Sequence, residues 1–239
     1  MRSRRAGTAF SRLREKAHSL AQFQNSPPAP IQNLREITNH IENFFGPNFF
    51  VLHEKESALV HIDINVVLPT PDRPCYTLLS SGMSDRFMKV PRGLAKLALA
   101  EVCLCLPKDW PISQKDMGWA TSEFFWPIKA LLQVARYPHL HETWLAQGHT
   151  IGDIERPDPV DPAGRFVGLF LLEPMTFPKG ADQLFAESGL EIRYLAIVPL
   201  LREELAFKLE HGAQALAGQL SAANVTELLD PQRQSVVSF

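Results

Sequence analysis

The chain has few of the features that mark a disulfide-rich, zinc-binding or membrane-spanning protein. It contains only three cysteines, and two of them, Cys103 and Cys105, lie two residues apart in an apolar run. This pattern fits neither a disulfide framework nor a zinc site. No stretch approaches the roughly 18 consecutive apolar residues of a spanning helix, and the first residues lack the apolar region of a secretory signal. These absences predict a cytoplasmic protein that has no membrane contact.

The charge balance and the missing motifs argue against several functional classes. The formal net charge of −2 gives no overall basic field, so we expect no nucleic-acid partner. The sequence has no phosphate-binding loop, no dinucleotide fingerprint and no GxSxG nucleophile elbow. The leading interpretation is therefore a protein that has no catalytic residues, no cofactor and no bound metal.

The sequence does contain enough apolar residues for one sizeable core, since 45% of it is hydrophobic. Residues 1–30 are basic and lead into a proline-containing linker, which is typical of a flexible leader. A basic arm for nucleic acid or for an anionic surface is the alternative role for this leader. Residues 31–239 show no second domain boundary, and we predict that they form a single domain.

Two paired strands are predicted within residues 60–85. In the first strand, apolar and polar residues alternate, which sends the apolar side chains to a core and leaves the other face to solvent. Replacing the polar residue Asn65 should therefore cost little stability. After a proline-rich connection, residues 75–80 form the second strand, and Gly82 permits a positive φ in the turn that ends it. The apolar face consists of Ile62, Ile64, Val66 and Leu68, and the polar face carries His61, Asp63 and Asn65.

The remaining patterns predict an α/β (α+β) protein that has a single mixed sheet of about five or more strands flanked by helices. A helix should begin at residue 31 and end before Gly46, and others should follow Pro127 and Pro199. Residues 92–106 are apolar nearly all round, which predicts a buried helix. Because Tyr137 precedes Pro138, the helix after Pro127 should end at Tyr137. The predicted strands are 49–54, 58–68, 75–80, 166–172 and 192–198.

Three blocks of the sequence together resemble the suppressor-of-fused (Sufu) domain family. They are YTLLSSGMSD at 76–85, WPIKALLQVARYPHLHETWLAQGHTI at 126–151 and RYLAIVPLLREEL at 193–205, and LCLPKDWP lies between the first two. The resemblance implies a Sufu-like α/β domain that binds another protein and has no catalytic activity. The length resembles that of bacterial single-domain members, which implies either an immunity protein that neutralises a toxin or a regulator that sequesters its partner through a short peptide segment.

The resemblance also implies where the partner binds. In the family, a tyrosine of an ARY motif and an acidic residue before a histidine grip a peptide; Tyr137 and His149 match, whereas Gly148 stands at the acidic position. Trp144 adds an aromatic side chain to the same loop, and aromatic residues on well-supported loops dominate many interfaces. The turn after Gly82 belongs to the first matching block. The predicted partner-binding residues are Tyr137, Trp144, His149, Gly82 and Asp85.

A rival interpretation is a hydrolase or metalloenzyme. His61 and Asp63 share one strand face and could approach His149, which would give a metal site or a pair for acid-base chemistry. Spacing alone completes no set of three ligands, so a polar solvent face is favoured for His61 and Asp63. His139 and His141 are predicted to lie on the surface. A metal analysis of the purified protein separates the two interpretations, since stoichiometric zinc would favour the enzyme.

Overall fold

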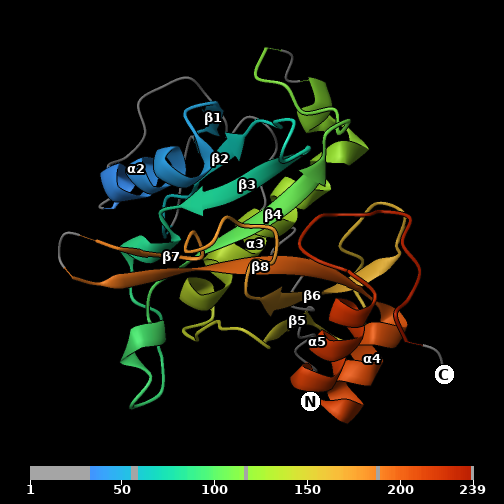
Figure 1. The fold of residues 1–239 in the computed structure, drawn as a ribbon. Coiled ribbons are helices and arrows are strands. Elements are labelled where there is room, and N and C mark those ends of the chain that lie inside the picture. The colour runs from blue at the N-terminus through green and yellow to red at the C-terminus, as the bar shows by residue number, and fades with distance from the viewer. Residues whose placement is uncertain (1–32, 55–58, 116–117, 187–188, 238–239) are drawn as a thin grey trace, which may run out of the picture.

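The computed structural model describes residues 33–54, 59–115, 118–186 and 189–237, which form one eight-stranded mixed sheet (Figure 1). The strands are β1 (Phe49–Leu52), β2 (Asp63–Val67), β3 (Cys75–Ser81), β4 (Ala100–Pro107), β5 (Thr150–Gly152), β6 (Phe166–Leu172), β7 (Gln183–Phe185) and β8 (Glu191–Leu201). Their order is β1-β2-β3-β4-β8-β6-β5, and β7 pairs with the first part of β8. β4 and β8 run parallel, whereas the other pairs are antiparallel. The prediction of one mixed sheet flanked by helices is confirmed.

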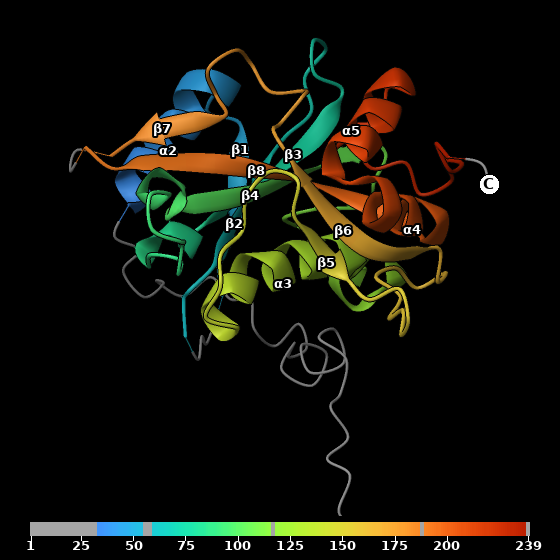
Figure 2. The same cartoon turned by 90° about the horizontal axis from the view of Figure 1, so that it is seen from below.

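Helices cover both faces of this sheet (Figure 2). They are α2 (Leu34–Phe45), α3 (Trp126–Leu140), α4 (Arg202–His211) and α5 (Ala213–Ala222). On one face, Ile64 and Leu104 belong to the core that α3 completes. On the other face, Val67 packs in a core with α2, and Phe170 packs in a third core with α4 and α5. Because side chains alternate along each strand, neighbouring strand residues serve different cores.

The segment predicted as a buried helix, residues 92–106, is a short 3-10 turn followed by β4, so that prediction was wrong. β4 is a central strand between β3 and β8, and helices cover both of its faces. A strand covered on both faces is apolar along its whole length, and periodicity alone cannot distinguish it from a buried helix. Leu94, which was expected to pack against the sheet, lies outside the core and is exposed.

The polar face of β2 is also buried, so the predicted solvent face was wrong. Asp63 and Asn65 are 0% and 1% exposed. The carboxylate of Asp63 accepts hydrogen bonds from the Glu54 N–H at 2.9 Å, from His53 at 2.9 Å and from His61 at 3.0 Å. These three donors replace the water that a buried carboxylate would otherwise need.

This burial reverses the expectation for Asn65. Its amide nitrogen donates to the Leu79 carbonyl at 3.4 Å and to Ser81 Oγ at 3.2 Å. Asn65→Ala should therefore lower the free energy of unfolding by about 1–3 kcal/mol, because it leaves buried acceptors without a donor. Urea denaturation measures the loss, and Asn43→Ala, at an exposed position of α2, is the matched control. Equal stability of the two variants would contradict this account.

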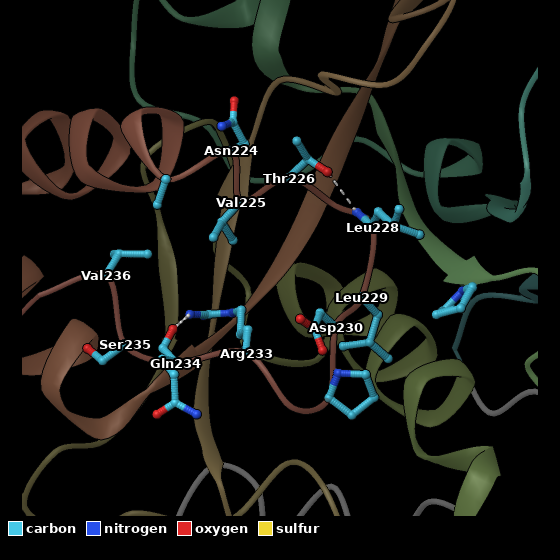
Figure 3. Close-up of a pocket in the computed structure, with 13 residues that line it drawn as sticks. Asn224, Val225, Thr226, Leu228, Leu229, Asp230, Arg233, Gln234, Ser235 and Val236 are labelled. Carbon is cyan, nitrogen blue, oxygen red and sulfur yellow. Dashed lines mark hydrogen bonds between the residues drawn. The ribbon is translucent and has the colours of Figure 1, made fainter.

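After α5 the chain returns to the sheet where β4 and β8 separate. Their parallel pairing extends to Cys103 and Ala196. Beyond that point the N–H of Cys105 donates to the Glu227 carbonyl, and the N–H of Leu229 donates to the Cys105 carbonyl, each at 2.9 Å. The C-terminal segment thus continues the sheet beside β4. Figure 3 shows the same segment around a cavity of about 640 Å³.

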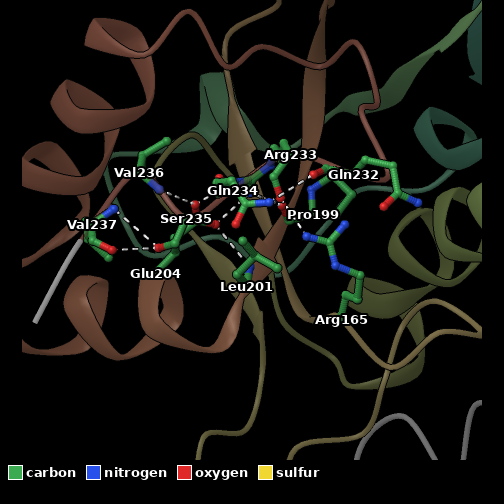
Figure 4. A network of polar contacts seen from close by, with 10 residues as sticks. All are labelled: Arg165, Pro199, Leu201, Glu204, Gln232, Arg233, Gln234, Ser235, Val236 and Val237. Atoms are coloured by element: carbon green, nitrogen blue, oxygen red, sulfur yellow. Dashed lines mark hydrogen bonds and ion pairs between the residues drawn. The ribbon is translucent and has the colours of Figure 1, made fainter.

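An ion pair fixes this segment to the start of α4 (Figure 4). Glu204 is 0% exposed and receives the guanidinium of Arg233, whose Nη2 lies 2.6 Å from one carboxylate oxygen. The backbone N–H groups of Leu201 and Val236 also donate to this carboxylate, each at 3.0 Å. Arg233 donates in addition to the Pro199 carbonyl at 2.7 Å, so one side chain joins α4, β8 and the C-terminal segment.

Three further expectations concern the whole chain. The predicted leader, residues 1–30, lies outside the residues that the structure describes. Among the described helices, none combines the length and the apolar composition needed to cross a membrane. The cysteines Cys75, Cys103 and Cys105 are buried and free.

Candidate functional site

The scaffold of the candidate site is α3, whose last turn carries Tyr137. The helix has Pro127 in its first turn, as predicted, but it continues through Pro138 to Leu140, so the predicted end at Tyr137 was wrong. Pro138 removes only one N–H donor near the end of the helix. The last turn still closes, because the His141 N–H donates to the Tyr137 carbonyl at 3.1 Å. Tyr137 therefore projects from a helix rather than from a loop.

Two aromatic pairs follow along this segment. The ring centroids of Tyr137 and His141 lie 4.4 Å apart, and those of Trp144 and His149 lie 4.5 Å apart in an edge-on arrangement. Tyr137 and Trp144 are partly buried against the α3 core, and each keeps an exposed portion. Gly148, with φ of +84°, donates its N–H to the Leu171 carbonyl at 2.7 Å and so holds the end of the loop on β6. The aromatic side chains thus stand on a fixed support.

The histidines of this region differ in their surroundings. Burial lowers the pKa of His149, the nearby charge of Lys208 lowers it further, and a hydrogen bond to the Trp144 backbone opposes the shift. A lowered pKa favours the neutral ring that packs against Trp144. His139 is buried, so its predicted surface position was wrong, and burial lowers its pKa as well. His141 is exposed, as predicted.

The turn after Gly82 is organised by Glu101, a residue that sequence reasoning missed. The buried carboxylate accepts hydrogen bonds from the Gly82 and Ser84 N–H groups at 3.0 Å, from Ser84 Oγ at 2.7 Å and from Ser80 Oγ at 2.5 Å. Burial raises the pKa of Glu101, and these hydrogen bonds oppose the rise. Gly82 has the predicted positive φ, +108°, but it is buried. The exposed surface begins only beyond this turn, at Arg86.

The structure brings the two predicted parts of the site together. The His139 ring hydrogen-bonds the Met83 carbonyl at 3.0 Å, which joins the end of α3 to the turn that holds Gly82 and Asp85. The Lys89 N–H donates to the Thr143 carbonyl at 3.1 Å, and the next contact joins Leu145 to Met88. The segments around residues 82–90 and 137–149 therefore form one continuous surface.

A cavity of about 400 Å³ lies beside Tyr137. Its wall includes β5 and the exposed side chain of Leu209 on α4. β5 is the last strand in the sheet order, so within the described residues its outer edge has no neighbouring strand. Such an edge offers backbone donors and acceptors to another extended chain. The polar rim of the cavity contains Asp153, Glu155, Arg156 and Asp158.

The residues of the rival enzyme interpretation are not brought together. His61, which precedes β2, contacts Asp63 at the start of that strand, whereas His149 lies beside β6 immediately before β5. Four strands separate β2 from β5 in the sheet order. Asp63 belongs instead to a network in which its neighbour Glu54 pairs with Arg136 of α3. In the described part of the chain, no group of three or more His, Cys, Asp or Glu side chains could hold a metal ion.

These features define a mixed α/β domain whose sheet is covered by helices on both faces. The model of the suppressor of fused protein (SUFU) family matches residues 59–234, and the chain belongs to this family. The search of curated proteins gave no match to the chain.

Solved structures share the fold at low sequence identity. A SUFU homologue from Neisseria gonorrhoeae is 16% identical, with a TM-score of 0.60, over 86% of this chain and 97% of that one. A chain of the Sufu–Fu complex is 15% identical, with a TM-score of 0.60, over 87% of this chain and 93% of that one. Drosophila Suppressor of Fused is 15% identical, with a TM-score of 0.60, and the match spans 88% of this chain but only 52% of the fly protein.

Proposed function

We propose that the chain is a non-catalytic protein-binding domain whose partner contacts the surface around Tyr137, Trp144 and His149. The observation that carries this proposal is that Tyr137 at the end of α3 and Trp144 in the loop after it each stack against a histidine and keep an exposed portion. The turn of Gly82, which is far away in sequence, contacts the same segment through His139. Side chains that are already held in place lose little conformational entropy on binding, so they make effective anchors. The occurrence of a Sufu–Fu complex among the similar structures also supports protein binding.

The open edge of β5 suits an extended peptide segment of the partner. A peptide strand added to a sheet edge gains backbone hydrogen bonds, and adjacent pockets select its side chains. The cavity beside Tyr137 lies directly at this edge and would hold one or more partner side chains. His149 and the turn of Gly82 and Asp85 shape and support the surface.

Two partner classes fit this proposal: a toxin that the chain neutralises as an immunity protein, and a regulatory protein that it sequesters. Affinity capture with the full chain, followed by identification of the bound protein, distinguishes them. A toxin would lose its activity when mixed with an equimolar amount of the chain. A regulator would be held in the complex without such a loss.

Tyr137→Ala and Trp144→Ala should each weaken binding of the captured partner by about 2 kcal/mol or more, because each removes an aromatic anchor. Isothermal titration calorimetry with the purified partner measures the change. Phe44→Ala is the matched control, since Phe44 is 37% exposed on α2, which packs on the opposite face of the sheet from α3.

Thermal melts separate a binding role from a structural one. A variant that loses affinity and keeps the wild-type melting temperature supports the interface. The proposed site is wrong if both aromatic variants bind the partner as tightly as the Phe44 variant does.

A further inference from the structure

A basic and apolar arm, residues 86–96, projects from the sheet between β3 and β4 (Figure 1). Its side chains include exposed apolar groups, since Phe87 is 60% exposed and Leu94 is 37% exposed. Met88 is buried and anchors the arm to the core beneath it. The arm contains no acidic residue, and its four cations are Arg86, Lys89, Arg92 and Lys96.

Glu142 faces two of these cations, because the Lys89 ammonium, and then the charge of Arg86, lower its pKa. Lys89 Nζ lies 2.9 Å from the Glu142 carboxylate, and both side chains are largely exposed. Among the described residues, no ion pair involves Arg86, Arg92 or Lys96. The chain as a whole carries a net charge of −2, so the arm is a local positive patch on a slightly acidic protein.

The arm adjoins the surface proposed to bind the partner. The backbone contact of Lys89 with Thr143 and the contact of Met88 with Leu145 place it next to Trp144. At the Tyr137 end of the same surface, three of the four charged residues on the cavity rim are acidic. The surface is therefore basic at the arm and predominantly acidic around the cavity.

We infer that the arm receives an acidic segment of the partner protein, an inference that rests on the proposed function. Carboxylates of this segment would pair with Arg86, Arg92 and Lys96, and an apolar side chain of the segment would pack on Phe87 and Leu94. Guanidinium groups bind carboxylates in a bidentate geometry, and complementary charge accelerates association and selects the partner. An anionic membrane or a nucleic acid suits the chain less well, because the net charge of −2 gives no overall basic field.

A synthetic peptide that alternates glutamate with leucine tests the arm directly. Fluorescence anisotropy with the full chain should show binding that weakens as salt is added. The triple variant Arg86→Glu/Arg92→Glu/Lys96→Glu should bind this peptide at least about tenfold more weakly. The control variant Lys108→Glu/Lys115→Glu/Lys179→Glu changes the net charge equally at exposed positions outside the arm and should bind like the wild type.

Three results would overturn the inference. The first is an equal loss of binding in both triple variants, which would reflect net charge alone. The second is equal binding of a peptide in which lysine replaces each glutamate. The third is tighter binding of phosphatidylserine vesicles or of a single-stranded oligonucleotide than of the acidic peptide, which would assign the arm to a membrane or a nucleic acid.

Binding of the captured partner by the variants distinguishes failure of this inference from failure of the proposed function. If Tyr137→Ala and Trp144→Ala abolish its binding and the arm variant has no effect, the inference is wrong and the proposed function stands. If the arm variant alone abolishes binding, the arm is the contact and the aromatic site is wrong. Losses in all three variants, with melting temperatures unchanged, support both.

Discussion

Arg233→Met should lower the free energy of unfolding by about 3–5 kcal/mol, because it leaves the buried carboxylate of Glu204 without its cation. Glu204 would keep only the N–H donors of Leu201 and Val236. Two neutral donors compensate poorly for the lost water and the lost charge partner. Methionine retains most of the length of the side chain, so the loss would reflect charge pairing rather than a large cavity.

Urea denaturation measures this loss, and two further variants control it. Arg202→Met alters an exposed arginine at the start of the same helix and should change stability by less than about 0.5 kcal/mol. The double variant Glu204→Gln/Arg233→Met removes both charges and keeps an amide oxygen that can accept from one of the two backbone N–H groups, so it should recover part of the stability that Arg233→Met loses. If Arg233→Met proved as stable as Arg202→Met, the ion pair would not hold the C-terminal segment.

Local patterns in the sequence predict much of the sheet. Strands were expected near the observed β1, β3, β6 and β8, and each is confirmed, because strand periodicity and turn residues are local signals. The positive φ of Gly82 was predicted for the same reason. The short strands β5 and β7 were not predicted, since three residues carry too little periodicity.

Long-range packing explains the wrong predictions. The apolar run at residues 92–106 fits a helix or a doubly covered strand equally well, and only the presence of β3 and β8 on either side decides between them. The polar face of β2 is buried because α2 and the core around Val67 cover that side of the sheet. The residues of a strand do not themselves show which strands lie beside it or which helix covers its face.

The buried carboxylates show the same limit. Glu204 and its partner Arg233 are 29 residues apart in the sequence, and Glu101 and its hydrogen-bond donor Ser80 are 21 residues apart. A single acidic residue within an apolar run is the one signal that could have found Glu101, because such a residue needs buried donors. This signal predicts that the acidic residue needs buried hydrogen-bond donors, but it does not identify which residues supply them.

The candidate site was predictable in part. Tyr137, Trp144 and His149 are close in sequence, and their grouping at the end of α3 follows from that proximity. The approach of the Gly82 turn depends on the contact of His139 with Met83, which spans 56 residues. Spacing gives no sign of this contact, and only the family resemblance pointed to both segments.

Glu101→Ala should lower the free energy of unfolding by about 4–5 kcal/mol, because it leaves a cavity and removes the acceptor of the Gly82 and Ser84 N–H groups. Glu101→Gln should cost much less, since its carbonyl oxygen can accept from both N–H groups and its amide can donate to Ser80 Oγ. Loss of the hydrogen bonds to Glu101 would loosen this turn, and it would also displace the arm that begins at Arg86.

The pH dependence tests whether Glu101 is held in an environment that disfavours its charge. Because burial raises its pKa, the folded state binds the proton more tightly than the unfolded state does. The wild type should therefore be most stable relative to Glu101→Gln near the ordinary glutamate pKa of about 4, and should lose this advantage as the pH rises through the raised pKa. Denaturation of both proteins between about pH 4 and pH 8 measures the difference. Parallel stability profiles would show that the hydrogen bonds balance burial. A relative gain by the wild type at higher pH would show that they outweigh it and that the carboxylate is charged in the folded protein.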